Sequence, residues 1–250
     1  MNETFTDHDY VTDEKFLAGY NAYQAKYAEQ MRESDRVMIS LIREVVAKRG
    51  DLGRPLRLLD IGCSTGNLLL HLKRQLPNLA LTGGDLAESS VEECRKNPEL
   101  AGIEFKTTDL LNLPADDHDI ITVNAVLYML DDSQFEQALC GINHALAPGG
   151  TLLAFDFFHP FEQHLSILET SRSHPKGLRL TFRSMRQVDR QLASAGFSTP
   201  VYQPFTLPID LPLVNGDELI TYTVPTADGR RLPFRGALFQ PWCHLIVGKG

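Results

Sequence analysis

The chain has 250 residues, 43% hydrophobic and 22% charged, with a formal net charge of −8; these values are typical of a cytoplasmic globular protein and argue against a nucleic-acid partner, which would need clustered Lys and Arg. No apolar run reaches the ~20 residues of a membrane span, and the polar, acidic N-terminus predicts no secretory signal. The four cysteines lack zinc-site spacing, so we expect reduced thiols and no metal.

The first 50 residues are predicted to be helical. Apolar residues recur at helical spacing from Ser34 to Gly50, with Ser34 or Asp35 as the N-cap and Gly50 at the end. An aromatic stripe with spacings of three or four residues precedes this helix and consists of Phe16, Tyr20, Tyr23 and Tyr27. Packing of the stripe onto the core is the favoured interpretation, and contact with a ligand is the alternative.

From residue 56 onward, short apolar runs alternate with helical stretches. We predict strands at 56–62, 79–85, 103–109, 119–126 and 151–158. The helices between them are predicted at 67–76, 88–96 and 133–147, the last capped by Ser133 and ended by Pro148-Gly149-Gly150. The continuous apolar runs of the first, fourth and fifth strands are typical of a parallel sheet buried on both faces. The alternation predicts an α/β fold with a doubly wound sheet.

The last hundred residues are less regular. A helix is predicted over 184–197, with Ser184 and Gln187 in a capping-box arrangement. Two strands are predicted, at 200–208 and at 241–249. Between them, Asp228-Gly229 predicts the turn of a hairpin.

The first strand leads into a glycine-rich turn, LLDIGCSTGN. Gly62 and Gly66 allow the backbone to turn tightly and to approach a ligand where a Cβ would obstruct it. The spacing is G-x-x-x-G and not the G-x-G-x-x-G of a dinucleotide site. Asp60, two positions before Gly62, would repel a pyrophosphate but can accept hydrogen bonds from loop amides or from a ligand ammonium group.

Two further carboxylates end the next strands. Asp85 follows Gly66 by 19 positions, a separation at which an acidic residue accepts from both hydroxyls of a ribose. Asp109 ends the third strand and can accept from an exocyclic amine such as that of adenine. Acidic residues on three successive strands favour a nucleoside that bears a positive group, and they disfavour a nucleoside polyphosphate.

Together, over about residues 56–160, these motifs resemble those of the class I S-adenosylmethionine-dependent methyltransferases that act on small molecules. The resemblance implies a seven-stranded, mostly parallel Rossmann-like sheet with an antiparallel last strand and helices on both faces. It implies a helical cap at 1–50 over the cofactor and acceptor site, and a methyltransferase domain at 51–250 with a β-hairpin insertion at 205–240 on the acceptor side. Ser64 stands where the family has a glycine.

The implied cofactor is S-adenosyl-L-methionine, with S-adenosyl-L-homocysteine as product. Arg32 is expected to pair with the cofactor carboxylate, and Tyr27 to close over the cofactor. The complete set of predicted cofactor-binding residues is Tyr27, Arg32, Asp60, Gly62, Cys63, Ser64, Gly66, Asn67, Asp85, Leu86, Asp109, Leu110 and Asn124.

Two residues are predicted to act on the acceptor. His159 directly follows the fifth strand and is the first candidate for a general base, with a loop histidine of no role as the alternative. Tyr128 follows the fourth strand and can contact the acceptor or the methyl group, or else face the core. The expected acceptor is a small polar molecule that is methylated on an oxygen or nitrogen atom. A sugar or sugar-linked intermediate is the specific hypothesis.

Other functions remain open at this stage. A non-catalytic S-adenosylmethionine-binding module would carry the same motifs. A nicotinamide-dependent oxidoreductase is disfavoured by the missing third glycine, and an RNA methyltransferase by the negative charge. The sequence leaves a homodimer open.

Overall fold

The computed structural model describes residues 14–50, 52–169, 177–208, 221–225, 231–235 and 240–250. The chain divides into two compact units, of which the first spans Met1–Phe205 with Pro241–Gly250 and the second spans Thr206–Gln240. In the second unit, β9 (Thr221–Pro225) and β10 (Arg231–Arg235) form an antiparallel hairpin, as predicted. The predicted turn at Asp228-Gly229 lies outside the described residues.

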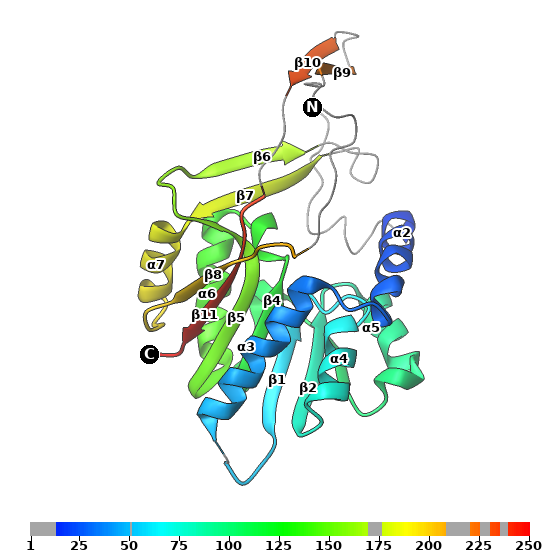
Figure 1. Cartoon of the computed structure of the whole chain (residues 1–250), viewed down its shortest axis with the longest axis vertical. Helices are drawn as coiled ribbons and strands as arrows, with labels where there is room; N and C mark the ends of the chain where they lie inside the picture. The colour runs from blue at the N-terminus through cyan, green and yellow to red at the C-terminus, as the bar shows by residue number, and fades with distance from the viewer. Residues whose placement is uncertain (1–13, 51, 170–176, 209–220, 226–230, 236–239) are drawn as a thin grey trace. The chain divides into compact units, whose positions relative to one another are not determined.

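The first unit is built on a sheet whose main path runs β3-β2-β1-β4-β5-β11-β8 (Figure 1). The strands from β3 to β5 pair in parallel, whereas β11, the last strand of the chain, is antiparallel to both β5 and β8. The prediction of a mostly parallel sheet with seven strands in line and an antiparallel last strand is thereby confirmed. The strands are β1 (Leu56–Ile61), β2 (Leu79–Asp85), β3 (Glu104–Thr107), β4 (His118–Asn124), β5 (Leu146–His159), β8 (Val201–Pro204) and β11 (Trp242–Gly248).

A hairpin that the sequence did not predict extends this sheet. β6 (Leu165–Glu169) pairs antiparallel with β7 (Leu178–Ser184), and β7 pairs in parallel with the end of β5. The strand pattern was missed because β6 has only five residues, with exposed side chains along most of its length. The hairpin brings β7 beside the end of β5, next to the carboxyl edge of the sheet.

Helices cover both faces of the sheet. In β1, Leu58 belongs to a buried cluster that includes residues of α3 and α4, and Leu59 belongs to a second buried cluster that includes residues of α6 and α7. This alternation follows from the two-residue period of a strand. The helices are α2 (Glu14–Ala25), α3 (Glu33–Arg49), α4 (Asn67–Gln75), α5 (Glu88–Lys96), α6 (Asp132–Ala145) and α7 (Met185–Ser194).

The helix caps differ in part from the predictions. The N-cap of α3 is Arg32, without a side-chain cap bond, instead of Ser34 or Asp35. The N-cap of α6 is Asp131, which forms a capping box with Gln134, instead of Ser133. Both errors concern neighbouring polar residues, and backbone conformation decides which of them caps. The predicted cap of α7 at Ser184, which accepts from Gln187 N at 3.2 Å, is confirmed.

The boundary between α6 and β5 was also predicted wrongly. The helix ends at Ala145 and β5 begins at Leu146, so Pro148-Gly149-Gly150 lies within the strand assignment and does not terminate the helix. By contrast, Gly50 ends α3 as expected and has a φ of +70°.

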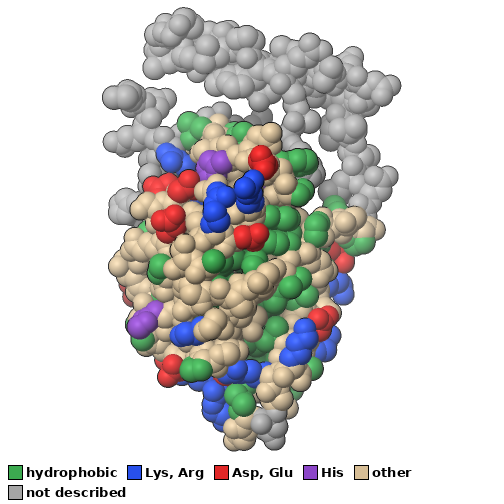
Figure 2. All heavy atoms as spheres, turned by 90° about the vertical axis from the view of Figure 1, so that its left-hand side faces the viewer, with side chains coloured by type: hydrophobic (Ala, Val, Ile, Leu, Met, Phe, Trp, Pro, Cys, Tyr) green, Lys and Arg blue, Asp and Glu red, His purple; other side chains and the backbone are tan. Residues whose placement is uncertain are grey.

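The surface shown in Figure 2, on the side of α7, carries Lys and Arg intermixed with Asp and Glu, with hydrophobic side chains between them. Over the described residues of this face, the basic side chains do not join into a continuous strip. None of the described helices combines the length and the apolar character needed to cross a bilayer.

Candidate functional site

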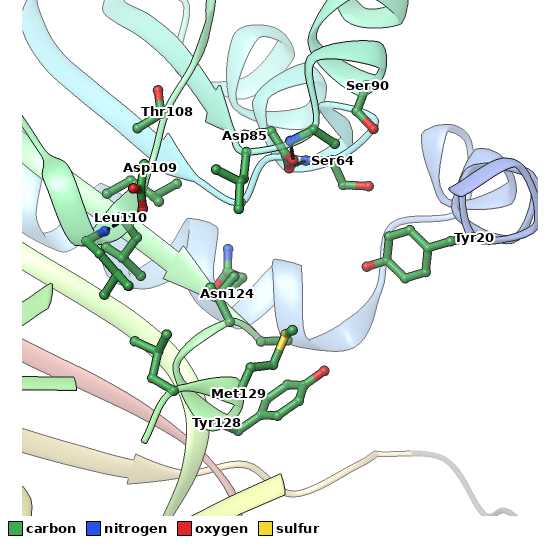
Figure 3. A pocket seen from close by; sticks show the side chains of 18 of the residues that line it. Tyr20, Ser64, Asp85, Ser90, Thr108, Asp109, Leu110, Asn124, Tyr128 and Met129 are labelled. Atoms are coloured by element: carbon green, nitrogen blue, oxygen red, sulfur yellow. Dashed lines mark hydrogen bonds between the residues drawn. The ribbon is translucent and has the colours of Figure 1, made fainter. Parts of the chain in front are cut away.

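A pocket opens where β1, β2 and β4 end, the edge at which a doubly wound sheet binds its ligand (Figure 3). Its atom-free space is about 1030 Å³, counting the part that opens to solvent. The predicted site residues that line the pocket are Gly62, Ser64, Asp85, Leu86, Asp109, Leu110, Asn124 and Tyr128.

The turn after β1 holds Asp85 in place. Ser64 N donates to Asp85 Oδ2 at 2.8 Å, and Ala87 N donates to Asp85 Oδ1 at 2.9 Å. Each carboxylate oxygen keeps a further lone pair, so the group can accept two more hydrogen bonds. The amide of Gly62 donates to Gly84 O at 2.8 Å and joins the turn to β2. The arrangement presents a pre-oriented carboxylate to a ligand that carries neighbouring hydroxyl groups.

Asp60 lies beneath the pocket and is not among the residues that line it. Its side chain is 3% exposed and accepts a hydrogen bond from Thr122 Oγ1 at 2.7 Å, whereas the expected donors were loop amides or a ligand ammonium group. Burial raises the pKa of Asp60 to about 7, with smaller contributions from the charges of Asp35 and Asp85. Burial also raises the pKa of Asp85. A positively charged ligand would relieve this accumulation of buried acidic groups, because it favours their ionised forms.

Asp109 forms another wall of the pocket. Its carboxylate accepts from Leu111 N at 2.9 Å and from Asn112 Nδ2 at 2.5 Å, and it caps a short 3₁₀ turn over Leu110–Asn112. These bonds fix the orientation of the carboxylate, as the amides of the first turn do for Asp85. Carboxylates from β2 and after β3 therefore meet at one edge of the sheet, which matches the prediction from the strand ends.

Besides Asp60, five predicted cofactor residues are absent from the pocket lining: Tyr27, Arg32, Cys63, Gly66 and Asn67. Asn67 Nδ2 donates to Gln24 O, and His71 Nε2, one helical turn further along α4, donates to Tyr27 O, each at 2.9 Å. Arg32 donates to Gln24 Oε1 and lies over the ring of Tyr27, 4.1 Å from its centroid. These side chains fasten the segment after α2 to α4.

That attachment brings α2 to the pocket, where Leu17 and Tyr20 contribute to the lining. Figure 3 shows the Tyr20 hydroxyl directed into the pocket from the side opposite Asn124. Tyr20 therefore takes the place in the pocket that was predicted for Tyr27. The helical spacing of the aromatic stripe was the available signal, but it does not distinguish which ring faces the pocket. Tyr23 points to solvent and is 54% exposed, so the interpretation that the stripe packs onto the core does not hold for that residue.

The two candidate catalytic residues are placed differently. Tyr128 lines the pocket, and its ring lies 5.3 Å from that of Phe157. His159 is 4% exposed, packs against the ring of Phe161 and is absent from the pocket lining. Within the described part of the chain, neither ring nitrogen of His159 has a hydrogen-bond partner. Its predicted role as a base was based on the position of the strand end, which does not determine where the side chain points.

The glycines of the first turn adopt the tight backbone conformation that was expected, and neighbouring side chains add a second requirement for glycine. A Cβ on Gly62 would lie 2.5 Å from Val126 Cγ2, and a Cβ on Gly66 would lie 2.9 Å from Leu100 Cδ1. Both glycines also have a positive φ, +74° and +73°. At each glycine an added Cβ would therefore meet a packed side chain of the protein, in addition to the strain of a positive φ. Ser64, at the position of the family's middle glycine, adopts a φ of +50°.

Gly66→Ala is therefore expected to lower the free energy of unfolding by about 1–3 kcal/mol, from backbone strain plus crowding at Leu100. Gly102→Ala is the matched control, because Gly102 also has a positive φ but no atom lies within 4 Å of its added Cβ. Urea unfolding of both variants measures the difference. Equal losses in the two variants would show that packing against Leu100 contributes nothing.

Comparison with known proteins agrees with this geometry. A family model described as a methyltransferase domain matches residues 58–150. The chain is 27% identical over 186 residues to a ubiquinone/menaquinone biosynthesis C-methyltransferase of Desulfotalea psychrophila, covering 66% of this chain and 74% of that protein. It is 30% identical over 179 residues to a malonyl-[acyl-carrier protein] O-methyltransferase of a Paenibacillus species, covering 66% of this chain and 64% of that protein.

A solved structure extends the similarity to nearly the whole chain. The 1,6-didemethyltoxoflavin-N1-methyltransferase of Burkholderia thailandensis, with its acceptor and S-adenosylhomocysteine bound, aligns with a TM-score of 0.60 at 16% identity. The alignment covers 98% of this chain and 91% of the other. At this identity the likeness establishes the fold, and the sequence matches above carry the relationship.

Proposed function

We infer that this chain, which belongs to the class I S-adenosylmethionine-dependent methyltransferases, transfers the methyl group of that cofactor to a carbon, oxygen or nitrogen atom of a small acceptor. The observation that carries the proposal is the Asp85 carboxylate, held by Ser64 N and Ala87 N at the pocket wall above buried Asp60. A pre-oriented acceptor of hydrogen bonds beside an excess of negative charge suits a ribose linked to a cationic centre.

In this proposal, the chain's own residues bind and orient the cofactor. Asp85 accepts from the ribose hydroxyls, Asp109 accepts from the adenine amine, and Leu86 and Leu110 supply apolar surface for the adenine ring. When bound, the sulfonium centre supplies a methyl group that is already activated for transfer. What the protein must then contribute is the alignment of the acceptor with that group, which reduces the barrier through orientation.

The acceptor end of the pocket has a distinct chemistry. Leu17, Tyr20, Tyr128, Met129 and Leu130 contribute two aromatic rings, a thioether and aliphatic groups. Within the described pocket lining, there is no Lys, Arg, His, Glu or Gln. A sugar would place several hydroxyl groups here with few partners, and each buried unpaired hydroxyl is unfavourable. We therefore propose an acceptor with a flat, largely apolar part in preference to the sugar that the sequence suggested.

The roles of the N-terminal helices and of the two candidate catalytic residues also belong to this proposal. Residues 1–50 would cover the site, with Leu17 and Tyr20 as their contribution. Tyr128 is the better placed of the two candidate catalytic residues, since it lines the pocket and His159 does not. The Desulfotalea relative is named for ubiquinone and menaquinone biosynthesis, and the Burkholderia enzyme binds the ring compound 1,6-didemethyltoxoflavin. Both names point to ring compounds, which is the class of acceptor proposed here.

The experiment measures S-adenosylhomocysteine formed from S-adenosylmethionine with two acceptor panels, one of hydroxylated naphthalenes and catechols and one of hexoses and nucleotide sugars. We expect cofactor binding by calorimetry and turnover above the acceptor-free background with the ring compounds. Turnover confined to the sugars would reverse the choice of acceptor. Cofactor binding without turnover on either panel or on further ring compounds would favour a non-catalytic binding module, and binding of NAD alone would contradict the family's chemistry.

A further inference from the structure

The acceptor end of the pocket depends on a segment with little regular structure, residues 126–131, here called the wall segment. Val126, Tyr128, Met129 and Leu130 of this segment line the pocket. Its only helical element is a single 3₁₀ turn over Leu127–Met129. The turn's own bonds, Met129 N to Val126 O and Leu130 N to Leu127 O, are both 3.2 Å long. Short 3₁₀ turns have poor hydrogen-bond geometry, so other contacts must fix the path of this backbone.

Arg183 of β7 supplies the first set of those contacts. Its guanidinium donates to Leu127 O at 2.9 Å, to Leu130 O at 2.6 Å and to Asp131 O at 3.2 Å. The fork of one side chain therefore spans the wall segment and binds three of its carbonyl groups. Charge-assisted bonds of this kind are stronger than those between neutral groups.

Asp156 of β5 supplies the second set, on the amide side of the same turn. Asp156 Oδ2 accepts from Tyr128 N at 3.2 Å, and Asp156 Oδ1 accepts from Phe157 N at 2.7 Å. The wall segment is thus held at its carbonyl groups by a cation and at an amide by a carboxylate. Tyr128, which lines the pocket, is therefore held at its own amide by Asp156 and is flanked by the carbonyl groups that Arg183 binds.

The side chains of Arg183 and Asp156 are each only 1% exposed, so the pair carries a large desolvation penalty. The charge of Arg183 is compensated by the nearby charge of Asp156, by Asp132 Oδ1 at 3.6 Å from Nε, and by the ring of Phe135, 4.2 Å from the guanidinium carbon. In other proteins, replacing a buried ion pair by apolar residues of similar volume is often neutral or stabilising, so stability alone does not explain a pair of this kind. What the charged pair adds is a defined backbone geometry, because directional bonds reach four backbone groups of one short segment.

We propose that Arg183 and Asp156 are positioning residues for the acceptor, and that the β6–β7 hairpin brings Arg183 to the wall segment so that Tyr128 and Met129 hold their places in the pocket. The inference rests on the proposed function for the meaning of the pocket. It does not concern cofactor binding, since the contacts of Asp85 and Asp109 lie on other strands.

The test compares Arg183→Met and Arg183→Lys with Arg186→Met, a matched control on α7 whose side chain is 71% exposed and pairs with Glu162. Hydrogen exchange is followed by mass spectrometry in peptides over 125–132 and over 58–70. In Arg183→Met we expect exchange in the first peptide to rise by about tenfold, since charge-assisted bonds are lost there. Exchange in the second peptide should stay unchanged, and Arg183→Lys should fall between wild type and Arg183→Met.

Two further measurements separate positioning from general loosening. The dissociation constant of S-adenosylhomocysteine should change less than about threefold in Arg183→Met, and the KM of a ring acceptor should rise at least about tenfold with the KM of the cofactor unchanged. Thr181→Val is the milder variant if Arg183→Met does not fold, because it removes only the bond from Thr181 Oγ1 to Leu130 O at 3.2 Å.

Unchanged exchange over 125–132 in the Arg183 variants would overturn the inference, and so would an equal rise in both peptides. Failure of the proposed function gives a different pattern: the wild-type protein would then bind no S-adenosylhomocysteine, while exchange over 125–132 would still respond to Arg183.

Discussion

Asp85→Ala is expected to weaken binding of S-adenosylmethionine by roughly 10- to 100-fold for each hydrogen bond to the ribose that is lost, while the protein remains folded, since hydrogen bonds to a charged group contribute roughly 1.5–3 kcal/mol each. The carboxylate is oriented before the ligand arrives, by Ser64 N at 2.8 Å and Ala87 N at 2.9 Å. The substitution leaves those two amides without their acceptor. It also removes one of the buried acids that favour a cationic ligand. The loss of the hydrogen bonds to the ribose and the loss of this negative charge both weaken binding of the cofactor.

Calorimetric titration with S-adenosylmethionine measures the effect, and thermal unfolding checks the fold. Glu104→Ala is the control, because Glu104 is exposed at the opposite end of the neighbouring strand β3. Asp85→Asn retains one oxygen acceptor and should bind more tightly than Asp85→Ala. A dissociation constant equal to that of the wild type would mean that Asp85 does not hold the ribose.

Asp119→Ala is expected to lower the free energy of unfolding by about 3 kcal/mol, since the hydrogen bonds accepted by a covered carboxylate are lost together. The Asp119 side chain is fully covered, and it accepts from Arg49 Nη2 at 3.0 Å and from Arg54 Nη1 at 2.6 Å. It also accepts from Arg57 N at 2.9 Å. One carboxylate therefore joins the end of α3, the connection after it and the start of β1 to β4. Urea unfolding at pH 7 is the measurement, with exposed Glu44→Gln as control.

The same cluster predicts a dependence on pH. Hydrogen bonds from Arg54, Arg57 and Arg49 outweigh burial and lower the pKa of Asp119 from 3.8 to about 2. A group whose pKa is lower in the folded state stabilises the fold above its unfolded pKa, and this contribution is lost as the pH falls through the folded value. The stability difference between wild type and Asp119→Asn should therefore be complete at pH 5 and shrink by about 2 kcal/mol towards pH 2. A difference independent of pH would contradict this account of the cluster.

Some site features depend on the position of residues along the chain and were predictable from sequence. Asp85 and Asp109 end successive parallel strands, and parallel strands end at one edge of the sheet. Gly62 was recognisable from the G-x-x-x-G turn, and the structure adds close packing against Val126 as a second reason for glycine there. Arg183 could not have been found in this way. Its contacts with the wall segment cross more than fifty positions, and no motif surrounds it.

The sequence by itself thus determined the doubly wound sheet, the edge at which the ligand binds and the acidic character of that edge, because apolar periodicity and strand ends are local properties of the chain. Only the tertiary structure decided which side chains face the pocket. It placed Tyr20 in the lining in place of Tyr27, set Asp60 beneath the pocket and kept His159 out of it. The physical reason is that the direction of a side chain depends on the layer packed against it, and those layers are formed by residues far away in sequence.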